Sequence, residues 1–278
     1  MKRFNNYLNE FEVRRYSPSF LIEKIFNGHI IVFNKSQDII DIVKIIEKKF
    51  FEIFGYHLKN FLFEEYYLNE PSSEEYFLEL QNEIKTCEMV NKKFLSFLCR
   101  LGFDQQKIFK DQYSLRYSPP IGKKSYGTLK PAKLHRDTWG SNIFSQINFW
   151  FPLHDVSECN SIFIVPSYFN KEVKNNSSEW SFGKFRKIKD YPSVPYTNEK
   201  INKKDKLFLS LKKGNIICFS GNHLHGSSQN HNKRINLETR IVYQDKNDSI
   251  SYPENIDSYS KISKKNWFIN SVTNKKLD

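Results

Sequence analysis

The second half of the chain is a series of short β-type segments, and this series restricts the possible fold more than any other feature. Five runs rich in β-branched and aromatic residues follow one another from Asp111 onward: QYSLRYS, QINFWFPL, NSIFIVP, NIICFS and RINLETRIVY. Clusters of Pro, Gly and Asn separate these runs, which is typical of antiparallel strands joined by turns. Their lengths and spacing predict a jelly roll or another antiparallel barrel.

The first part of the chain has helical patterning after one early strand, GHIIVF, at residues 28–33. Ser36 is placed to cap a helix whose apolar residues from Ile39 to Phe54 follow helical spacing, and Gly55 can end it. The fold class predicted from both halves is mainly β with flanking helices.

A second helix is predicted to start after Pro71, where Ser72 and Glu75 fit a capping box. Its apolar positions continue with helical spacing to Gly102. Both predicted helices carry an apolar stripe, so we expect them to pack on the outside of the barrel.

We predict a single domain at residues 1–278, because the sequence contains neither an internal repeat nor a linker-like segment. Within it we expect a helical part at 1–110, a jelly-roll core at 111–245 and a C-terminal tail at 246–278. Residues 170–206 form a long polar insertion, and loops of this length often serve function. We expect the insertion to act as a lid, because it carries aromatic residues among its charged ones.

Composition excludes several classes of protein. Hydrophobic residues make up 39% and aromatic residues 16%, which excludes a disordered chain. The net charge of +12 suits anionic partners such as nucleic acid, but the lysines are scattered, which favours a solvated surface.

The N-terminal residues lack an apolar signal-peptide core and no run reaches transmembrane length, so we expect a cytoplasmic protein without a membrane partner. The sequence leaves the oligomeric state open. Four widely spaced cysteines indicate reduced thiols rather than a disulfide framework: Cys87, Cys99, Cys159 and Cys218.

The stretch LHRDTW places His135 and Asp137 two residues apart. In an extended strand both side chains point to the same face, while Arg136 points away, so the pair can bind a metal. The segment FSGNHLHGSSQN adds His223 and His225, which we expect on one face after the strand NIICF. Two histidines and one carboxylate form the facial triad that holds non-heme Fe(II), and either histidine could complete it.

An arginine close to such a triad would indicate a site for a 2-oxo acid beside the metal. A facial triad leaves positions for O2 and a bidentate 2-oxo acid, whose distal carboxylate pairs well with a buried arginine. Arg234 begins the run RINLETR nine residues after His225, and Arg240 falls on the same strand face by alternation. Both arginines are therefore candidates for binding 2-oxoglutarate.

Three motifs together resemble the phytanoyl-CoA dioxygenase family, which comprises Fe(II)- and 2-oxoglutarate-dependent oxygenases on a double-stranded β-helix, a cupin-like jelly roll. The motifs are HRDTWGSNIFSQINFWFPL, the VP-Y-F-N-x-x-V-x-N-x-S pattern from Val165 to Ser177, and FSGNHLHGSSQN with a following arginine. The similarity covers residues 111–243 and is closest to bacterial members found near carbohydrate and surface-polysaccharide genes. It implies Fe(II), 2-oxoglutarate and O2 as cofactor and cosubstrates.

Matched to the family motifs, His135, Asp137 and His225 correspond to the iron ligands, and Arg234 to the arginine that binds 2-oxoglutarate. Only His225 directly precedes the H-G-S turn, so His223 falls outside the triad. The turn before Arg234 is shorter than the family pattern, which keeps Arg240 as an alternative.

The resemblance implies hydroxylation of a small molecule, such as a carbohydrate or another polar metabolite. Gln146 and Asn148 alternate on the strand after the His-x-Asp turn and could reach the cosubstrate or substrate from inside the barrel. Arg116 could bind an anionic substrate, and Trp139 is a further candidate for substrate contact.

Two other functions were weighed. RINLETR also resembles the R-x-N-L-x-x-R run of AlkB-type dioxygenases, which would imply demethylation of nucleic acid. The arginine lies too near the last histidine for that family, and QINFWFPL does not match it. A non-catalytic jelly-roll binding protein is the third possibility, against which the intact triad argues.

Overall fold

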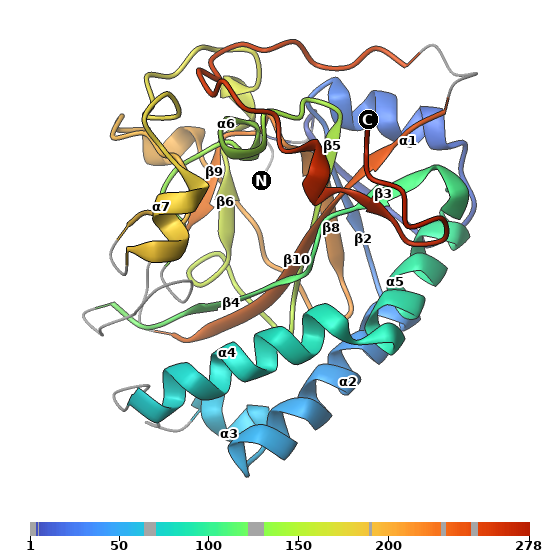
Figure 1. The fold of residues 1–278 in the computed structure, drawn as a ribbon, viewed down its shortest axis with the longest axis vertical. Coiled ribbons are helices and arrows are strands. Elements are labelled where there is room, and N and C mark those ends of the chain that lie inside the picture. The colour runs from blue at the N-terminus through green and yellow to red at the C-terminus, as the bar shows by residue number, and fades with distance from the viewer. Residues whose placement is uncertain are drawn as a thin grey trace.

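The computed structural model describes residues 4, 6–63, 71–121, 131–188, 191–228, 232–245 and 250–278. Within these ranges a large and a small β-sheet face one another across an apolar layer. Helices cover the other face of the large sheet (Figure 1). The predicted fold class, mainly β with flanking helices in a jelly roll, is confirmed.

The large sheet has eight strands. Its strands are β1 (Leu8–Phe11), β2 (Ile30–Phe33), β3 (Ile108–Lys110), β4 (Ser114–Ser118), β5 (Gln146–Pro152), β8 (Ile216–Ser220), β10 (Arg234–Tyr243) and β11 (Ile269–Asn270). They run in the order β1-β2-β8-β5-β10-β3-β11, and β4 also pairs with β10. The β1–β2 pair is parallel, and the other pairs are antiparallel. All five strands predicted from Asp111 onward are present.

The small sheet has the order β7-β6-β9, formed by Leu207–Phe208, Ile162–Ile164 and His225–Ser227. Side chains of both sheets meet between them, where Ile164 and Leu207 join Trp150 and Ile217 in one buried cluster. This layer closes the barrel along one part of its length.

Alternation along the strands separates two environments. On β5, Ile147, Phe149 and Phe151 pack in the core beneath the helices. The intervening residues Gln146 and Asn148 are buried on the opposite face, inside the barrel. The sequence QINFWFP thus forms a strand buried on both faces, with its polar side chains on the inner face.

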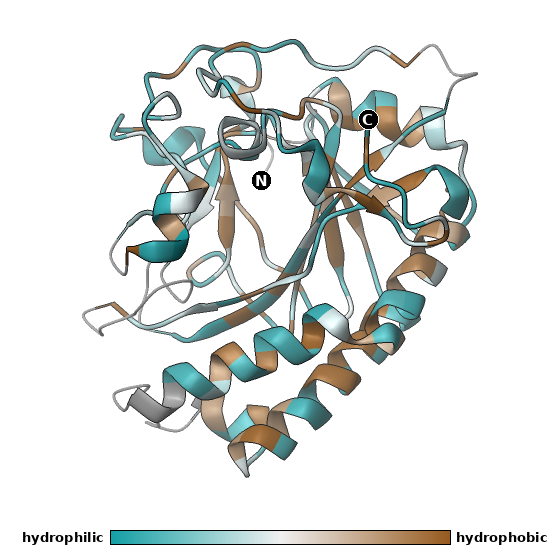
Figure 2. Ribbon diagram, in the orientation of Figure 1, coloured by the Kyte–Doolittle hydropathy of each residue, from teal (hydrophilic) through white to brown (hydrophobic). Residues whose placement is uncertain are grey.

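Helix α2 (Gln37–Phe54) follows the sequence prediction at both ends. The backbone N–H of Ile39 donates to the Ser36 hydroxyl, and Gly55 ends the helix at φ 75°, in the left-handed region that favours glycine. In Figure 2 the central strands are largely brown, whereas teal and brown alternate along the helices, as expected for helices that bury one face.

The second predicted helix is wrong in one respect. The structure divides it into α4 (Pro71–Thr86) and α5 (Glu88–Arg100), because Cys87 has extended dihedrals of φ −72° and ψ 105°. The bend allows both helices to contact α2. The capping box predicted from Ser72 lies outside the side chains that the structure describes.

Shorter helices complete the chain: α1 (Pro18–Phe26), α3 (Leu58–Phe63), α6 (Asp137–Ser141) and α7 (Phe182–Lys187). The four cysteines are free thiols, as predicted. Among the described helices none combines the length and hydropathy needed to cross a membrane.

Candidate metal centre

The backbone brings His135 and His225 side by side. Each residue donates its N–H to the carbonyl of the other at 2.9 Å, and their ring centroids lie 4.3 Å apart. Gly226 permits this approach, because a Cβ there would lie 3.1 Å from the Phe163 ring and 3.4 Å from the Cα of Leu134. Close packing therefore explains why glycine follows His225 in β9.

Asp137 completes the group. One ligand atom each of His135, Asp137 and His225 lies within 4.8 Å of the other two, and His135 Nε2 is 3.4 Å from Asp137 Oδ1. The strand predicted for the His-x-Asp pair is wrong, since Arg136 is extended but Asp137 is the first residue of α6. The two side chains nevertheless converge as the spacing predicted.

Hydrogen bonds orient these side chains for metal binding. His135 Nδ1 lies 2.6 Å from Lys133 O, and His225 Nδ1 lies 2.9 Å from His223 O. Because a carbonyl oxygen only accepts hydrogen bonds, Nδ1 carries the proton in both rings. This leaves each Nε2 lone pair free. Asn148 Nδ2 donates to Asp137 Oδ2 at 2.6 Å and leaves Oδ1 toward the histidines. The donor set therefore fits a divalent transition metal.

His223 does not join the group. It lies in the turn before β9 and is fully buried, with Nε2 3.1 Å from Gly28 O and Nδ1 3.2 Å from Ser220 O. The expectation that His223 and His225 share one strand face is wrong, because His223 lies in the turn before β9 and its ring meets the carbonyls of Ser220 and Gly28 instead. This leaves His225 as the histidine that faces Asp137.

Charge favours the metal-binding protonation states. Burial opposes ionisation of Asp137, but the two histidine rings, which become cationic at low pH, and the permanent charge of Arg240 outweigh it and hold the carboxyl pKa well below its usual range. Burial lowers the pKa of His225 to about 4. At neutral pH the aspartate is ionised and His225 is neutral, as coordination requires.

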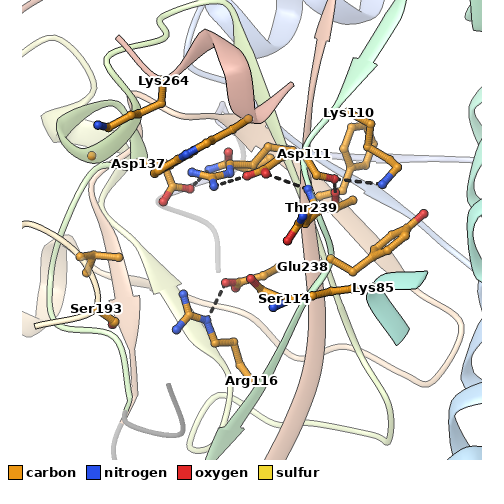
Figure 3. A pocket seen from close by; sticks show the side chains of 18 of the residues that line it. Lys85, Lys110, Asp111, Ser114, Arg116, Asp137, Ser193, Glu238, Thr239 and Lys264 are labelled. Atoms are coloured by element: carbon orange, nitrogen blue, oxygen red, sulfur yellow. Dashed lines mark hydrogen bonds and ion pairs between the residues drawn. The ribbon is translucent and has the colours of Figure 1, made fainter. Parts of the chain in front are cut away.

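The three residues line a cavity of about 1410 Å³. One wall is the inner face of β10, where Arg234, Asn236, Glu238 and Arg240 follow one another at every second position. Figure 3 shows Asp137 at one side of this wall and the Glu238–Arg116 pair below it. The cavity wall nearest the candidate ligands is thus mainly polar and charged.

Arg234 is buried and well ordered by hydrogen bonds. Its guanidinium donates to Ser161 O at 2.6 Å and to the hydroxyls of Ser118 and Ser227 at 2.7 and 2.9 Å. Within the described part of the chain it forms no ion pair with a carboxylate, and burial lowers its pKa to about 10. A buried cation of this kind is an attractive partner for an anion.

Arg240 is already paired with a carboxylate. Its Nη2 donates to Asp111 Oδ2, and the charges of Asp111 and Asp137 raise the pKa of Arg240 despite its burial. Its guanidinium also lies 5.3 Å from the centre of the Trp267 ring. The two arginines predicted as alternatives thus differ, because Arg240 has a carboxylate partner and Arg234 does not.

Arg116, predicted as a substrate contact, lines the cavity, and its Nε donates to Glu238 Oε1 at 2.7 Å (Figure 3). Sequence reasoning missed Glu238 and Asp111. The alternation of polar residues in RINLETR could have indicated Glu238, whereas nothing local marks Asp111 as the partner of Arg240.

Two predicted contact residues lie behind the cavity wall. Gln146 is fully buried, accepts from Ser141 Oγ at 2.7 Å and donates to Asn148 at 3.2 Å, so it acts on Asp137 only through Asn148. Trp139 is a correction: its side chain is 0% exposed, packs in a buried cluster and does not line the cavity.

Arg136, between the candidate ligands, was predicted only to point away from them. Its side chain is 1% exposed and forms an ion pair with Asp257, with Nε 3.1 Å from Oδ2. The same guanidinium donates to four backbone carbonyls, those of Tyr168, Phe169, Lys171 and Asn222. Arg136 therefore fastens the His-x-Asp turn to three other segments.

The insertion at 170–206 contributes to the cavity where the structure describes it. Trp180, Phe182 and Phe185 all line it, and Phe182 meets Trp267 of the C-terminal segment with ring centroids 4.9 Å apart. The aromatic residues of the predicted lid thus face the cavity.

No protein-family model matches the chain, and no curated protein matches it either. Several solved structures are similar at low identity. EvdO2 from Micromonospora carbonacea var. aurantiaca, complexed with 2-oxoglutarate, has a TM-score of 0.39 and 12% identity over 66% of this chain and 71% of EvdO2. EctD from S. alaskensis, with 2-oxoglutarate and 5-hydroxyectoine, has a TM-score of 0.42 and 14% identity over 82% of this chain and 76% of EctD. The non-heme alpha ketoglutarate dependent epimerase SnoN, from nogalamycin biosynthesis, has a TM-score of 0.32 and 11% identity over 62% of this chain and 61% of SnoN.

Proposed function

We propose that this chain is an Fe(II)- and 2-oxoglutarate-dependent dioxygenase that hydroxylates a small molecule. The observation that carries the proposal is the convergence of His135, Asp137 and His225 in one cavity, with both histidines held so that Nε2 is free. Two imidazoles and one carboxylate are the donor set of non-heme Fe(II) oxygenases. Iron bound there would supply the activation of O2 that couples conversion of 2-oxoglutarate to succinate and CO2 with hydroxylation.

Arg234 is the proposed partner of the distal 2-oxoglutarate carboxylate. Its charge has no described carboxylate partner, whereas Arg240 is occupied by Asp111. The hydroxyls of Ser118 and Ser227 accept from Arg234, so their own O–H groups remain able to donate to a carboxylate. A carboxylate between these groups would compensate the desolvated guanidinium.

Other residues of the chain hold the ligands in place. Asn148 fixes one carboxylate oxygen of Asp137, and Gln146 fixes Asn148 in turn. Gly221 allows Gln146 to lie close to the backbone, since a Cβ at that glycine would be 2.5 Å from Gln146 Nε2. We therefore assign Asn148 and Gln146 to positioning of Asp137.

A polar substrate, such as a carbohydrate, is proposed from the cavity lining. Arg116, Glu238 and Asn236 present hydrogen-bonding groups to it, and the aromatic side chains of Phe182 and Trp267 face it. The HRDTWG and HLHGSS motifs support membership of the phytanoyl-CoA dioxygenase family as part of this proposal.

We also propose that residues 170–206 act as a lid on the substrate side. Cutting the chain within this segment should stop substrate hydroxylation but leave iron binding and slow substrate-free decarboxylation of 2-oxoglutarate. Loss of iron, or cooperative unfolding at a much lower temperature, would place the segment in the core instead.

The iron site is tested by anaerobic addition of Fe(II) and 2-oxoglutarate, which should produce a weak visible charge-transfer band at one iron per chain. His225→Ala should abolish the band. His223→Gln is the matched control, since His223 is equally buried but faces away, and it should retain the band once circular dichroism shows that it is folded. The opposite pattern would disprove the ligand assignment.

A further inference from the structure

The cavity that contains the candidate ligands continues around an edge of the large sheet. In the register of β10, Arg240 lies opposite Asn148, whose side chain faces Asp137. The next residue, Ile241, belongs to the core under the helices, and it pairs directly with Lys110 of β3. Directly opposed residues share a sheet face, so Lys110 lies on the helical side.

Residues on both sides line this one cavity. On the helical side they include Gln81 and Lys85 of α4, Asn91 of α5 and Lys110. The passage crosses the sheet edge between the end of β3 and the start of β4, and Figure 3 shows Asp111 between Asp137 and Lys110, with Ser114 below them beside Glu238. A ligand at the triad could therefore extend to the helical side.

Lys110 is a half-buried cation at the far end of this passage. Its Nζ donates to Asp111 O at 2.9 Å and lies 4.0 Å from the centre of the Tyr113 ring. Burial lowers the pKa of its ammonium to about 8, against the opposing charge of Asp111. Its side chain is half-buried, and among the described residues no carboxylate forms an ion pair with it, so the charge of the ammonium is only partly compensated.

The nearby carboxylates are already engaged. Asp111 pairs with Arg240, Glu238 pairs with Arg116, and Asp137 belongs to the candidate triad. A ligand that binds along this path therefore meets a positive charge at Lys110 that has no ion-pair partner in the described part of the protein.

We propose that the substrate is elongated and carries an anionic oxygen group, phosphate or carboxylate, that binds at Lys110 while its other end lies at the triad. This inference rests on the proposed function for the oxidised end. The Lys110 site itself is an anion subsite that binds without iron or turnover. The ammonium would supply one charge-assisted hydrogen bond, and the neighbouring amides of Gln81 and Asn91 would accommodate a polar chain.

Site-specific acetylation tests the subsite. Iron-free protein is treated briefly with acetic anhydride, without addition, with inorganic phosphate or with acetate at equal ionic strength, and modified lysines are quantified by peptide mass spectrometry. Phosphate should reduce acetylation of Lys110 about tenfold and leave Lys212, which is exposed and lies outside the cavity, nearly unchanged. Protection by acetate as well would identify a subsite for either anion, and protection by acetate alone would identify a carboxylate subsite.

Equal protection of Lys110 and Lys212 would indicate general screening and overturn the proposal, as would no protection of Lys110 by either anion. In binding titrations, Lys110→Met should weaken phosphate about tenfold, and Lys110→Arg should restore much of it. Lys212→Met, at an exposed lysine outside the cavity, is the control. The charge-transfer band tests the iron site separately, so the two failures are distinguishable.

Discussion

Replacement of Arg136 by methionine should destabilise the protein more than loss of any exposed ion pair. Methionine keeps most of the side-chain volume but leaves Asp257 as a buried carboxylate, 2% exposed, without its cationic partner. Removing one member of a buried ion pair costs about 3–5 kcal/mol. Four backbone carbonyls also lose a donor, which makes the upper part of that range the expected value.

The assay is urea unfolding followed by circular dichroism, with Lys212→Met as the matched control. Lys212 Nζ lies 3.0 Å from Asp155 Oδ2, but the two side chains are 77% and 58% exposed. Exposed pairs at this distance contribute about 0–1 kcal/mol, so the control should remain close to wild type. Arg136→Lys should fall between the two, because lysine keeps the charge but not the planar fork.

A second readout separates a general loss of stability from an effect on the candidate site. Arg136 lies between two proposed ligands and donates to Asn222 O, three residues before His225. Arg136→Met should therefore weaken Fe(II) binding under conditions in which the protein is fully folded. If Arg136→Met lost no more free energy of unfolding than Lys212→Met, the assignment of Arg136 as the residue that fastens these segments would be refuted.

Three further outcomes are expected. Arg234→Ala should raise the 2-oxoglutarate concentration for half-maximal decarboxylation about 100-fold, much more than Arg240→Ala, and the reverse order would move the cosubstrate site to Arg240. Burial lowers the pKa of His223 to about 3, so the unfolded chain takes up this proton first as pH falls below about 6.5. The iron-free protein should then lose about 2 kcal/mol of stability between pH 7.5 and 5 through this residue, and urea titrations of His223→Gln should show a shallower dependence. Ser36→Ala should cost about 1 kcal/mol in the same assay, and a change near zero would contradict the capping role.

Local sequence signals predicted six strands, which are β2, β4, β5, β6, β8 and β10, and the ends of α2. They depend on residues close in the chain, such as Ser36 with Ile39 and the alternation in QINFWFP. The two-residue spacing of His135 and Asp137 predicted their convergence, although α6 replaces the expected strand. These features can be predicted from sequence because each depends on residues only a few positions apart.

Long-range contacts explain what the sequence did not reveal. Arg136 and Asp257 are 121 residues apart, and Asp111 and Arg240 are 129 apart, so neither pair leaves a periodic pattern. The interruption at Cys87 is also a tertiary feature. The bend between α4 and α5 accompanies the contact of both helices with α2, and this contact leaves no local signal in the sequence.

The C-terminal segment, predicted as a tail, forms part of the site. Asp257 accepts from Arg136, and it also accepts from the indole of Trp139 at 2.7 Å. Further along, Trp267 lies against Arg240 and Phe182. A chain ending at residue 245 would retain all three proposed iron ligands but lose the carboxylate that pairs with the residue between two of them. The ligand set therefore depends on residues beyond the jelly-roll strands that carry it.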